Sequence, residues 1–175
     1  MSQFALSQPE PGEYAPGFDQ YIQLALPLEI PAALTGQLTR LTTLLSGISA
    51  EEALVHHAPY TWSTHQVVGH ITDTERVFGY RTLRLARADS TPLPGFDENA
   101  FMAAVDFNQI PLSQLVDEFV HLRRSHIALF QNIPAAAWQH MGTVSSHPIS
   151  ARAMAYALVG HAEHHLGILE KRLRG

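Results

Sequence analysis

Three histidines and a glutamate lie within five positions near the end of the chain, in the stretch LVGHAEHHLGILEKRL, residues 158–173. On an α-helix, residues four apart lie on the same face, so His161 and His165 point in the same direction. His164 is rotated by about 60° from His161, onto the flank of the helix. The face of His161 and His165 also carries apolar residues one turn apart, at Met154, Leu158 and Ile168. Two imidazoles therefore replace two core side chains.

A further histidine, His70, lies on the inward face of an earlier helix. That face is traced by side chains at helical spacing, namely Val67, Ile71, Thr74, Phe78 and Leu85. In a helical bundle, the level of His70 can coincide with that of His161 and His165. Three converging neutral imidazoles form a suitable donor set for Zn²⁺ or Ni²⁺ and leave a position open for water, which such an ion acidifies. The sequence therefore predicts one divalent metal ion bound by these three histidines.

Histidines at such positions do not always bind metal. A single buried histidine is more often a hydrogen-bonded core residue than a ligand, and a pair four apart also occurs on solvated faces. Burying several imidazoles without partners has a desolvation cost, so the three together favour a metal site. A zincin-type peptidase is excluded, because its glutamate directly follows the first histidine of the pair. This chain has Ala162 there.

No catalytic side chain is predicted beyond water activated by the metal. Asp73 and Glu163 are candidates for hydrogen bonding to the ligand histidines, which would orient the imidazoles. An ion pair with Arg76 or another arginine accounts for Asp73 at least as well. Glu163 could also pair with an arginine or act as a base, but a solvated or ligand-orienting position is favoured for it. Weaker candidates, more simply understood as solvated or core residues, are Arg81, Arg84, Arg87, His126 and His147.

The composition of the 175 residues excludes several classes of protein. Hydrophobic residues make up 46% and charged residues 15%, as expected for a folded domain with its own core. The net charge is −5 and the 11 lysines and arginines form no cluster, so nucleic acid is not an expected partner. The absence of cysteine excludes thiolate ligands and cysteine nucleophiles. With no long apolar span or signal peptide, we expect a cytoplasmic protein without membrane contact.

Helical periodicity predicts an all-α fold with four long helices, and nothing in the sequence indicates a sheet. The helices are expected over about 30–46, from Ser63 onward, over 112–133 and over about 150–173. Ser63 followed by Gln66 has the pattern of a capping box at a helix start. Helices of this length favour a four-helix bundle. Residues 1–20 are expected to form an irregular N-terminal arm and residues 21–175 a single domain.

The predicted connections, 48–62, 89–111 and 133–149, are long for a bundle, in which loops usually have about 2–8 residues. They are interpreted either as crossovers or as a cap over one end of the bundle. The segment 89–111 is mostly apolar, with a helical turn expected around 99–104. Long apolar connections of this kind are often packed down and functional.

Several motifs occur in a fixed order along the chain: W-S at 62–63, G-H-x-x-D-T-E-R at 69–76, P-L-P-G-F-D at 92–97 and G-H-x-x-H-H at 160–165. With these motifs the chain resembles the DinB/YfiT-like superfamily of metal-binding four-helix bundles, close to its YfiT-type branch, from about Tyr21 onward. The resemblance implies a three-histidine metal site, with ligands that correspond by position to His70, His161 and His165. The family pattern has GHELHH where this chain has GHAEHH, so any role of that glutamate is not carried over.

The resemblance leaves three functions open. Some members of the family resemble metal-dependent hydrolases, and others are transferases or isomerases that use a low-molecular-weight thiol such as bacillithiol. A thiol on a metal is deprotonated and becomes a good nucleophile. The third interpretation is a metal-stabilised bundle without catalysis that acts in stress response or partner binding. A fourth protein ligand on the metal would contradict both enzymatic interpretations. A small-molecule substrate is the expected partner, and a homodimer is a family-level expectation.

Overall fold

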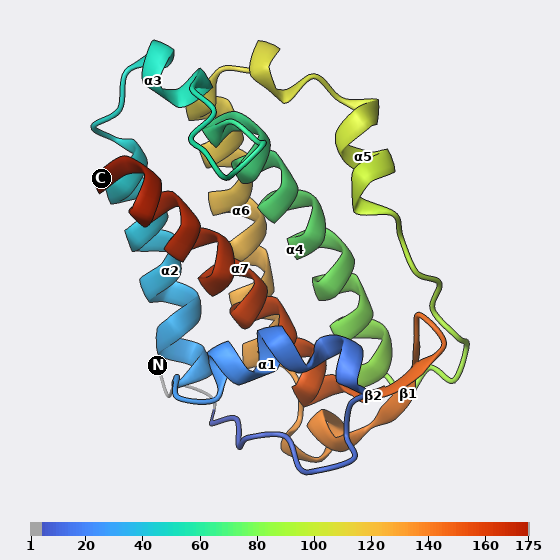
Figure 1. The fold of residues 1–175 in the computed structure, drawn as a ribbon. Helices are drawn as coiled ribbons and strands as arrows, with labels where there is room; N and C mark the ends of the chain where they lie inside the picture. The colour runs from blue at the N-terminus through green and yellow to red at the C-terminus, as the bar shows by residue number, and fades with distance from the viewer. Residues whose placement is uncertain (1–4, 175) are drawn as a thin grey trace.

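A computed structural model describes residues 5–174, and four long helices form the body of the protein (Figure 1). They are α2 (Ile30–Leu45), α4 (Thr64–Ala86), α6 (Leu112–Gln131) and α7 (Ala151–Arg174). The predicted ends of α2, α6 and α7 lie within two residues of the observed ends. The predicted four-helix bundle is confirmed, in a chain that is mostly helical.

Local sequence sets where α4 and α7 begin. The capping box predicted at Ser63 is present: its hydroxyl accepts a hydrogen bond from the Gln66 amide at 3.2 Å, and the Gln66 side chain accepts one from the Ser63 amide at 3.0 Å. At the start of α7, the Ser150 hydroxyl accepts a hydrogen bond from the amide of Ala153 at 3.0 Å. These caps fix the residues at which the two helices begin.

The core consists of two apolar clusters stacked along the bundle. One contains Leu34, Phe78, Phe130 and Leu158, and the other contains Leu41, Val67, Phe119 and Leu166. Each of the four long helices thus contributes to both clusters. Helix α7 packs against α2 and α4, and α6 packs against α2 and α4 on the other side. Between the two clusters, all four helices carry buried polar side chains, and the predicted metal ligands lie in this layer.

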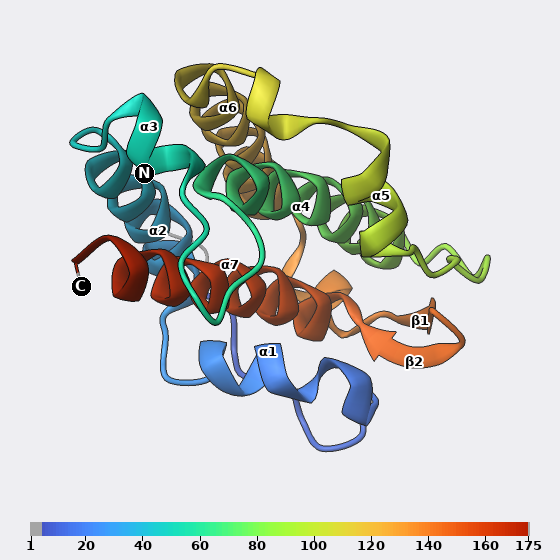
Figure 2. The same ribbon diagram turned by 45° about the horizontal axis from the view of Figure 1, so that its top comes forward.

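The connections contain short helices that the sequence did not predict in full. A 3₁₀ turn at Pro16–Phe18 leads into α1 (Asp19–Ala25), which packs across α7 (Figure 2). Both begin inside the segment 1–20 that was expected to be irregular, and residues 1–4 of that segment lie outside the described range. Other short elements are α3 (Ala50–Leu54), α5 (Glu98–Ala104), and 3₁₀ turns at Phe107–Gln109 and Ala135–Gln139. Helix α5 matches the helical turn expected around 99–104.

The expectation that the chain has no sheet is wrong. Strands β1 (Met141–Val144) and β2 (His147–Ser150) pair as an antiparallel hairpin directly before α7. The two-residue turn, Ser145–Ser146, has φ values of +52° and +68°. Tight hairpins favour such positive φ values, but asparagine and glycine usually supply them. The Ser-Ser sequence therefore concealed the turn, and the hairpin could not be recognised from it.

No helix within residues 5–174 combines the length and the apolar character needed to cross a membrane.

Candidate metal centre

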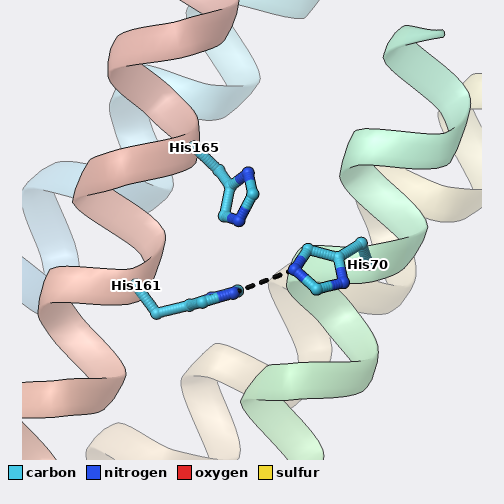
Figure 3. Close-up of side chains that lie close together, drawn as sticks. All are labelled: His70, His161 and His165. Atoms are coloured by element: carbon cyan, nitrogen blue, oxygen red, sulfur yellow. Dashed lines mark hydrogen bonds between the residues drawn. The ribbon is translucent and has the colours of Figure 1, made fainter. Parts of the chain in front are cut away.

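The structure brings His70 of α4 together with His161 and His165 of α7 (Figure 3). One nitrogen of each ring lies within 4.8 Å of the corresponding atoms of the other two. The Nε2 atoms of His70 and His161 are 3.0 Å apart. Among the described residues, no other group of three or more histidine or acidic side chains is close enough together to hold a metal ion. The spatial convergence that the sequence predicted is therefore present.

All three imidazoles are buried, with exposed fractions of 4%, 4% and 8% for His70, His161 and His165. Burial, reinforced by the neighbouring imidazoles, lowers the pKa of His70 to about 4 and that of His165 to about 3. The same two causes hold the pKa of His161 well below its usual range. The rings are therefore neutral at pH 7, and each has a nitrogen lone pair to offer.

A metal ion fits this donor set. Zinc–nitrogen bonds of about 2.0–2.1 Å place tetrahedral ligand atoms about 3.3 Å apart, close to the His70–His161 separation. The Nδ1 atom of His165 is buried without a hydrogen-bond partner. Buried polar atoms are normally paired, and three imidazoles in one apolar surrounding are difficult to satisfy from one another. A divalent ion with a preference for nitrogen would accept one lone pair from each of the three rings, from the nitrogens that lie close together.

A glycine before each ligand segment lets another element cover the site. A Cβ atom on Gly160 would lie 1.7 Å from the backbone oxygen of Tyr21 in α1, and one on Gly69 would lie 2.4 Å from the ring of Phe107. Because both positions lack a side chain, these neighbours lie directly against α7 and α4. The Tyr21 ring consequently lies 5.1 Å from the ring of His161. Both G-H pairs of the sequence are thus explained by close packing.

A network of buried polar side chains lies beside the histidines. Arg123 of α6 donates two hydrogen bonds to Glu75 of α4, at 2.7 and 2.9 Å, and one to Gln37 of α2, at 2.9 Å. His126 Nδ1 lies 3.0 Å from the same glutamate. Burial alone would raise the pKa of Glu75, but Arg123 and the hydrogen bond with His126 outweigh it and lower the pKa. The network therefore contains an ionised pair at the centre of the bundle.

The same network reaches α7 and the surface. Gln37 Nε2 donates to the carboxylate of Glu163 and to the backbone oxygen of Val159, both at 2.9 Å. Arg40 completes the chain with hydrogen bonds of 2.8 Å to Glu163. A continuous set of charged and amide groups thus joins all four long helices at the level of the histidines.

Neither carboxylate proposed as a hydrogen-bond partner of the ligands has that role. Asp73 lies 3.5 Å from Arg76, and Glu163 pairs with Arg40. Within residues 5–174, no hydrogen bond joins either of them to His70, His161 or His165. Asp73 thus has the ion pair that was its alternative interpretation, and Glu163 is bonded to Arg40 and Gln37.

The remaining candidates also have clear positions. His164 is exposed, on the flank of α7, and lies outside the histidine cluster. His126 belongs to the network around Glu75, and His147 is exposed. Arg81, for which a solvated position was expected, is buried and donates a hydrogen bond of 2.7 Å to the backbone oxygen of Pro94.

The sequence patterns did not identify Gln37, Arg123 or Arg172. Gln37 occurs at helical spacing between Leu34 and Leu41, on the buried face of α2. Arg123 lies in the same way between Phe119 and His126 on the buried face of α6. A polar residue within an apolar stripe is therefore the sequence feature from which Gln37 and Arg123 could have been recognised.

One pocket borders the histidine cluster. It has a volume of about 290 Å³ and is lined by His165 together with Tyr60, Trp62, Val67, Ile168 and Arg172, among others. Most of the lining comes from the chain between α3 and α4 and from the second half of α7. Figure 2 shows where these two segments lie. The Trp62 ring also lies 4.8 Å from the ring of His70. A larger pocket of about 450 Å³, lined by residues such as Leu45 and Val116, contains none of the three histidines.

Comparisons with known proteins give a family and a fold. The family model of the DinB superfamily matches residues 33–169, a range that contains all three histidines. A solved structure with a similar fold is that of YfiT from Bacillus subtilis, described as "a probable metal-dependent hydrolase with an unusual four-helix bundle topology". The TM-score is 0.74 at 16% sequence identity, over 97% of this chain and 94% of that one. No curated protein matches the sequence significantly.

Proposed function

We propose that this chain, which belongs to the DinB superfamily, is a metal-dependent hydrolase of a small-molecule substrate, with one divalent ion held by His70, His161 and His165. The observation that carries the proposal is the convergence of three buried, neutral imidazoles beside an open pocket. The fold shared with YfiT, which is described as a probable metal-dependent hydrolase, supports the same class of activity.

The chemistry of the donors favours Zn²⁺ or Ni²⁺ over Mg²⁺ or Ca²⁺, because imidazole suits the former and oxygen ligands the latter. When bound, such an ion acts as a Lewis acid and lowers the pKa of water towards 7. The contribution of the protein is to keep the three imidazoles neutral and close together. Burial keeps the rings of His70 and His165 neutral, and the packing of α4 against α7 holds the three rings close together.

The surroundings of the site favour catalysis over a purely structural role for the metal. The cluster contains three side chains in the described chain, without a fourth histidine or acidic group. A closed structural zinc site normally has four protein ligands, whereas a catalytic site keeps one position open. His165 also lines the pocket, so a substrate there would lie beside a ligand of the metal. The pocket volume suits a small molecule.

An activity screen of the metal-loaded protein tests the proposal. Zinc- and nickel-loaded samples are incubated with a panel of small esters, amides and lactones, with water alone or with added bacillithiol-like thiol. We expect hydrolysis with water alone, and we expect chelation of the metal to abolish it. Turnover that requires the thiol would replace the hydrolase proposal by the S-transferase interpretation. No turnover of any substrate by protein that holds its metal would favour a non-catalytic bundle.

A further inference from the structure

Arg172, in the last turns of α7, is a buried cation without an acidic partner. Its exposed fraction is 6%, and its Nη2 atom donates one hydrogen bond of 3.3 Å to the backbone oxygen of Val55. Its Nε and Nη1 atoms are buried and have no hydrogen-bond partner. Burial holds the pKa of Arg172 below its usual value, although a guanidinium stays protonated in proteins. Most of the donor capacity of this side chain is therefore unused.

Of the three other buried arginines in the described chain, two are paired with carboxylates, and the third, Arg81, donates to the backbone oxygen of Pro94 and to the Ser145 hydroxyl and has no unpartnered buried nitrogen. Arg123 has Glu75, and Arg152 has Glu13, with hydrogen bonds in both cases. Buried charges are rarely left unpaired, because the desolvation cost is then not compensated. Among residues 5–173, no carboxylate takes this place beside Arg172. The described residues therefore leave this guanidinium largely unsatisfied, and the pocket that it lines is the place where a ligand could pair with it.

Arg172 faces the pocket that borders the histidine cluster. It follows His165 by two turns of α7, so the two residues share a face, and helical side chains lean towards the N-terminal end of the helix. Both residues line the same pocket. Its Cζ atom lies 5.7 Å from the centre of the Tyr60 ring. The rest of the lining is mainly apolar or aromatic, from Pro59, Trp62, Val67 and Ile168.

We infer that this pocket binds a small organic carboxylate, with the carboxylate on Arg172 and an apolar or aromatic body against Tyr60 and Trp62. A planar carboxylate matches the fork of guanidinium N–H groups. Arg172 is the one arginine or lysine that lines the pocket. A single negative charge would therefore be balanced there, whereas a phosphate dianion would bring an uncompensated charge into an apolar site.

The carboxylate subsite also orients its ligand. A molecule anchored on Arg172 would extend along the pocket towards His165, so its far end would lie beside the metal centre. If such a ligand is the substrate, then the hydrolase acts on a molecule that bears a carboxylate, and this conclusion rests on the proposed function. The binding of the carboxylate itself requires neither catalysis nor metal.

Binding of benzoate, compared with uncharged benzamide, tests the inference. The sequence has two tryptophans, Trp62 in the pocket lining and Trp138 in the core, so 5-fluorotryptophan labelling gives two ¹⁹F signals. We expect benzoate to shift the Trp62 signal saturably, in metal-loaded and in chelated protein, and to bind at least about tenfold more tightly than benzamide. Arg172→Leu should remove this preference, and Arg172→Lys should retain part of it. The control Arg124→Leu, which deletes one exposed charge from α6, should leave it intact.

Equal binding of benzoate and benzamide to the wild-type protein would overturn the inference, and this comparison requires no variant to fold. Undiminished benzoate binding by Arg172→Leu would also overturn it, because the carboxylate would then be held elsewhere, for example by the metal. Metal content is measured on the same samples. If wild-type protein prefers benzoate but takes up no metal on reconstitution, or hydrolyses nothing in the activity screen, the hydrolase proposal fails while the carboxylate subsite stands.

Discussion

At the scale of single residues, the unusual property of the site is that three imidazoles are held neutral by burial. A histidine in an unfolded chain has a pKa of about 6.5. In the folded protein without metal, the pKa is about 4 for His70 and about 3 for His165. At a pH between these pKa values and 6.5, the unfolded chain therefore binds more protons than the folded one. Stability contributed by the neutral rings is complete above pH 6.5 and is lost as the pH falls below it.

We therefore predict that the chelated protein becomes less stable as the pH is lowered from 6.5 to 5. The slope is up to about 1.4 kcal/mol per pH unit for each buried histidine that takes up a proton on unfolding. Denaturant titrations at a series of pH values measure this slope. Between pH 5 and 6.5 most carboxylates stay ionised, so the histidines dominate the change. His165→Gln should reduce the slope, and His121→Gln, at an exposed position of α6, should not. A flat profile for the chelated wild type would contradict the assignment of neutral buried rings.

At the scale of the helices, the Glu75–Arg123 pair links α4 to α6 in the centre of the bundle. Both side chains are almost fully buried, at 1% and 0% exposed. Removing one charge of such a pair leaves the other buried and unpaired, which costs about 3–5 kcal/mol. We predict a loss of this size in the free energy of unfolding for Glu75→Gln.

A matched substitution on the surface provides the control for Glu75. Glu118 pairs with Arg76 of α4 at exposed positions, with exposed fractions of 44% and 43%. Exposed ion pairs contribute at most about 1 kcal/mol, so Glu118→Gln should have a small effect. Chemical denaturation of the two variants compares them directly. Similar losses in both would show that burial of the Glu75–Arg123 pair adds nothing to its effect on stability.

The packing of α1 on α7 depends on Gly160. A methyl group there would lie 1.7 Å from the backbone oxygen of Tyr21, and a backbone atom cannot be displaced without moving the helix. We predict that Gly160→Ala destabilises the protein by roughly 1–3 kcal/mol and loosens α1. Thermal unfolding measures the first effect, and faster proteolysis of the N-terminal segment the second.

Gly167 offers the control on the same helix. A Cβ atom there would meet nothing within 4 Å. Alanine is also the better helix former, by about 1 kcal/mol. Gly167→Ala should therefore be neutral or stabilising. Equal effects of the two substitutions would mean that close contact with α1 is not the reason for glycine at position 160.

At the scale of the whole molecule, the sequence predicted the features that depend on local periodicity. Spacing determined the faces of α4 and α7, and with them the convergence of His70, His161 and His165. The contacts between Gln37, Glu75 and Arg123 depend on how helices distant in sequence pack, so no local pattern could specify the partners. Helix α1 escaped prediction because so short a helix owes its stability to packing on α7 rather than to its own propensity.

The arrangement of the bundle explains how a metal site is compatible with a stable core. Two apolar clusters lie on either side of a polar layer, which contains the histidines and the Glu75–Arg123 network. The apolar clusters supply most of the buried hydrophobic surface, and the polar layer satisfies most of its own hydrogen bonds. The site is thus held by all four long helices, and the pocket that His165 lines borders it.

The metal content of the untagged protein tests the central claim most directly. Protein is reconstituted with Zn²⁺ or Ni²⁺, desalted and analysed for metal by mass spectrometry, alongside His165→Ala and the neighbouring His164→Ala. We predict about one ion per chain in the wild type and in His164→Ala, and none in His165→Ala. Wild-type protein that holds no ion after reconstitution, or His165→Ala protein that holds as much as the wild type, would contradict the three-histidine metal centre.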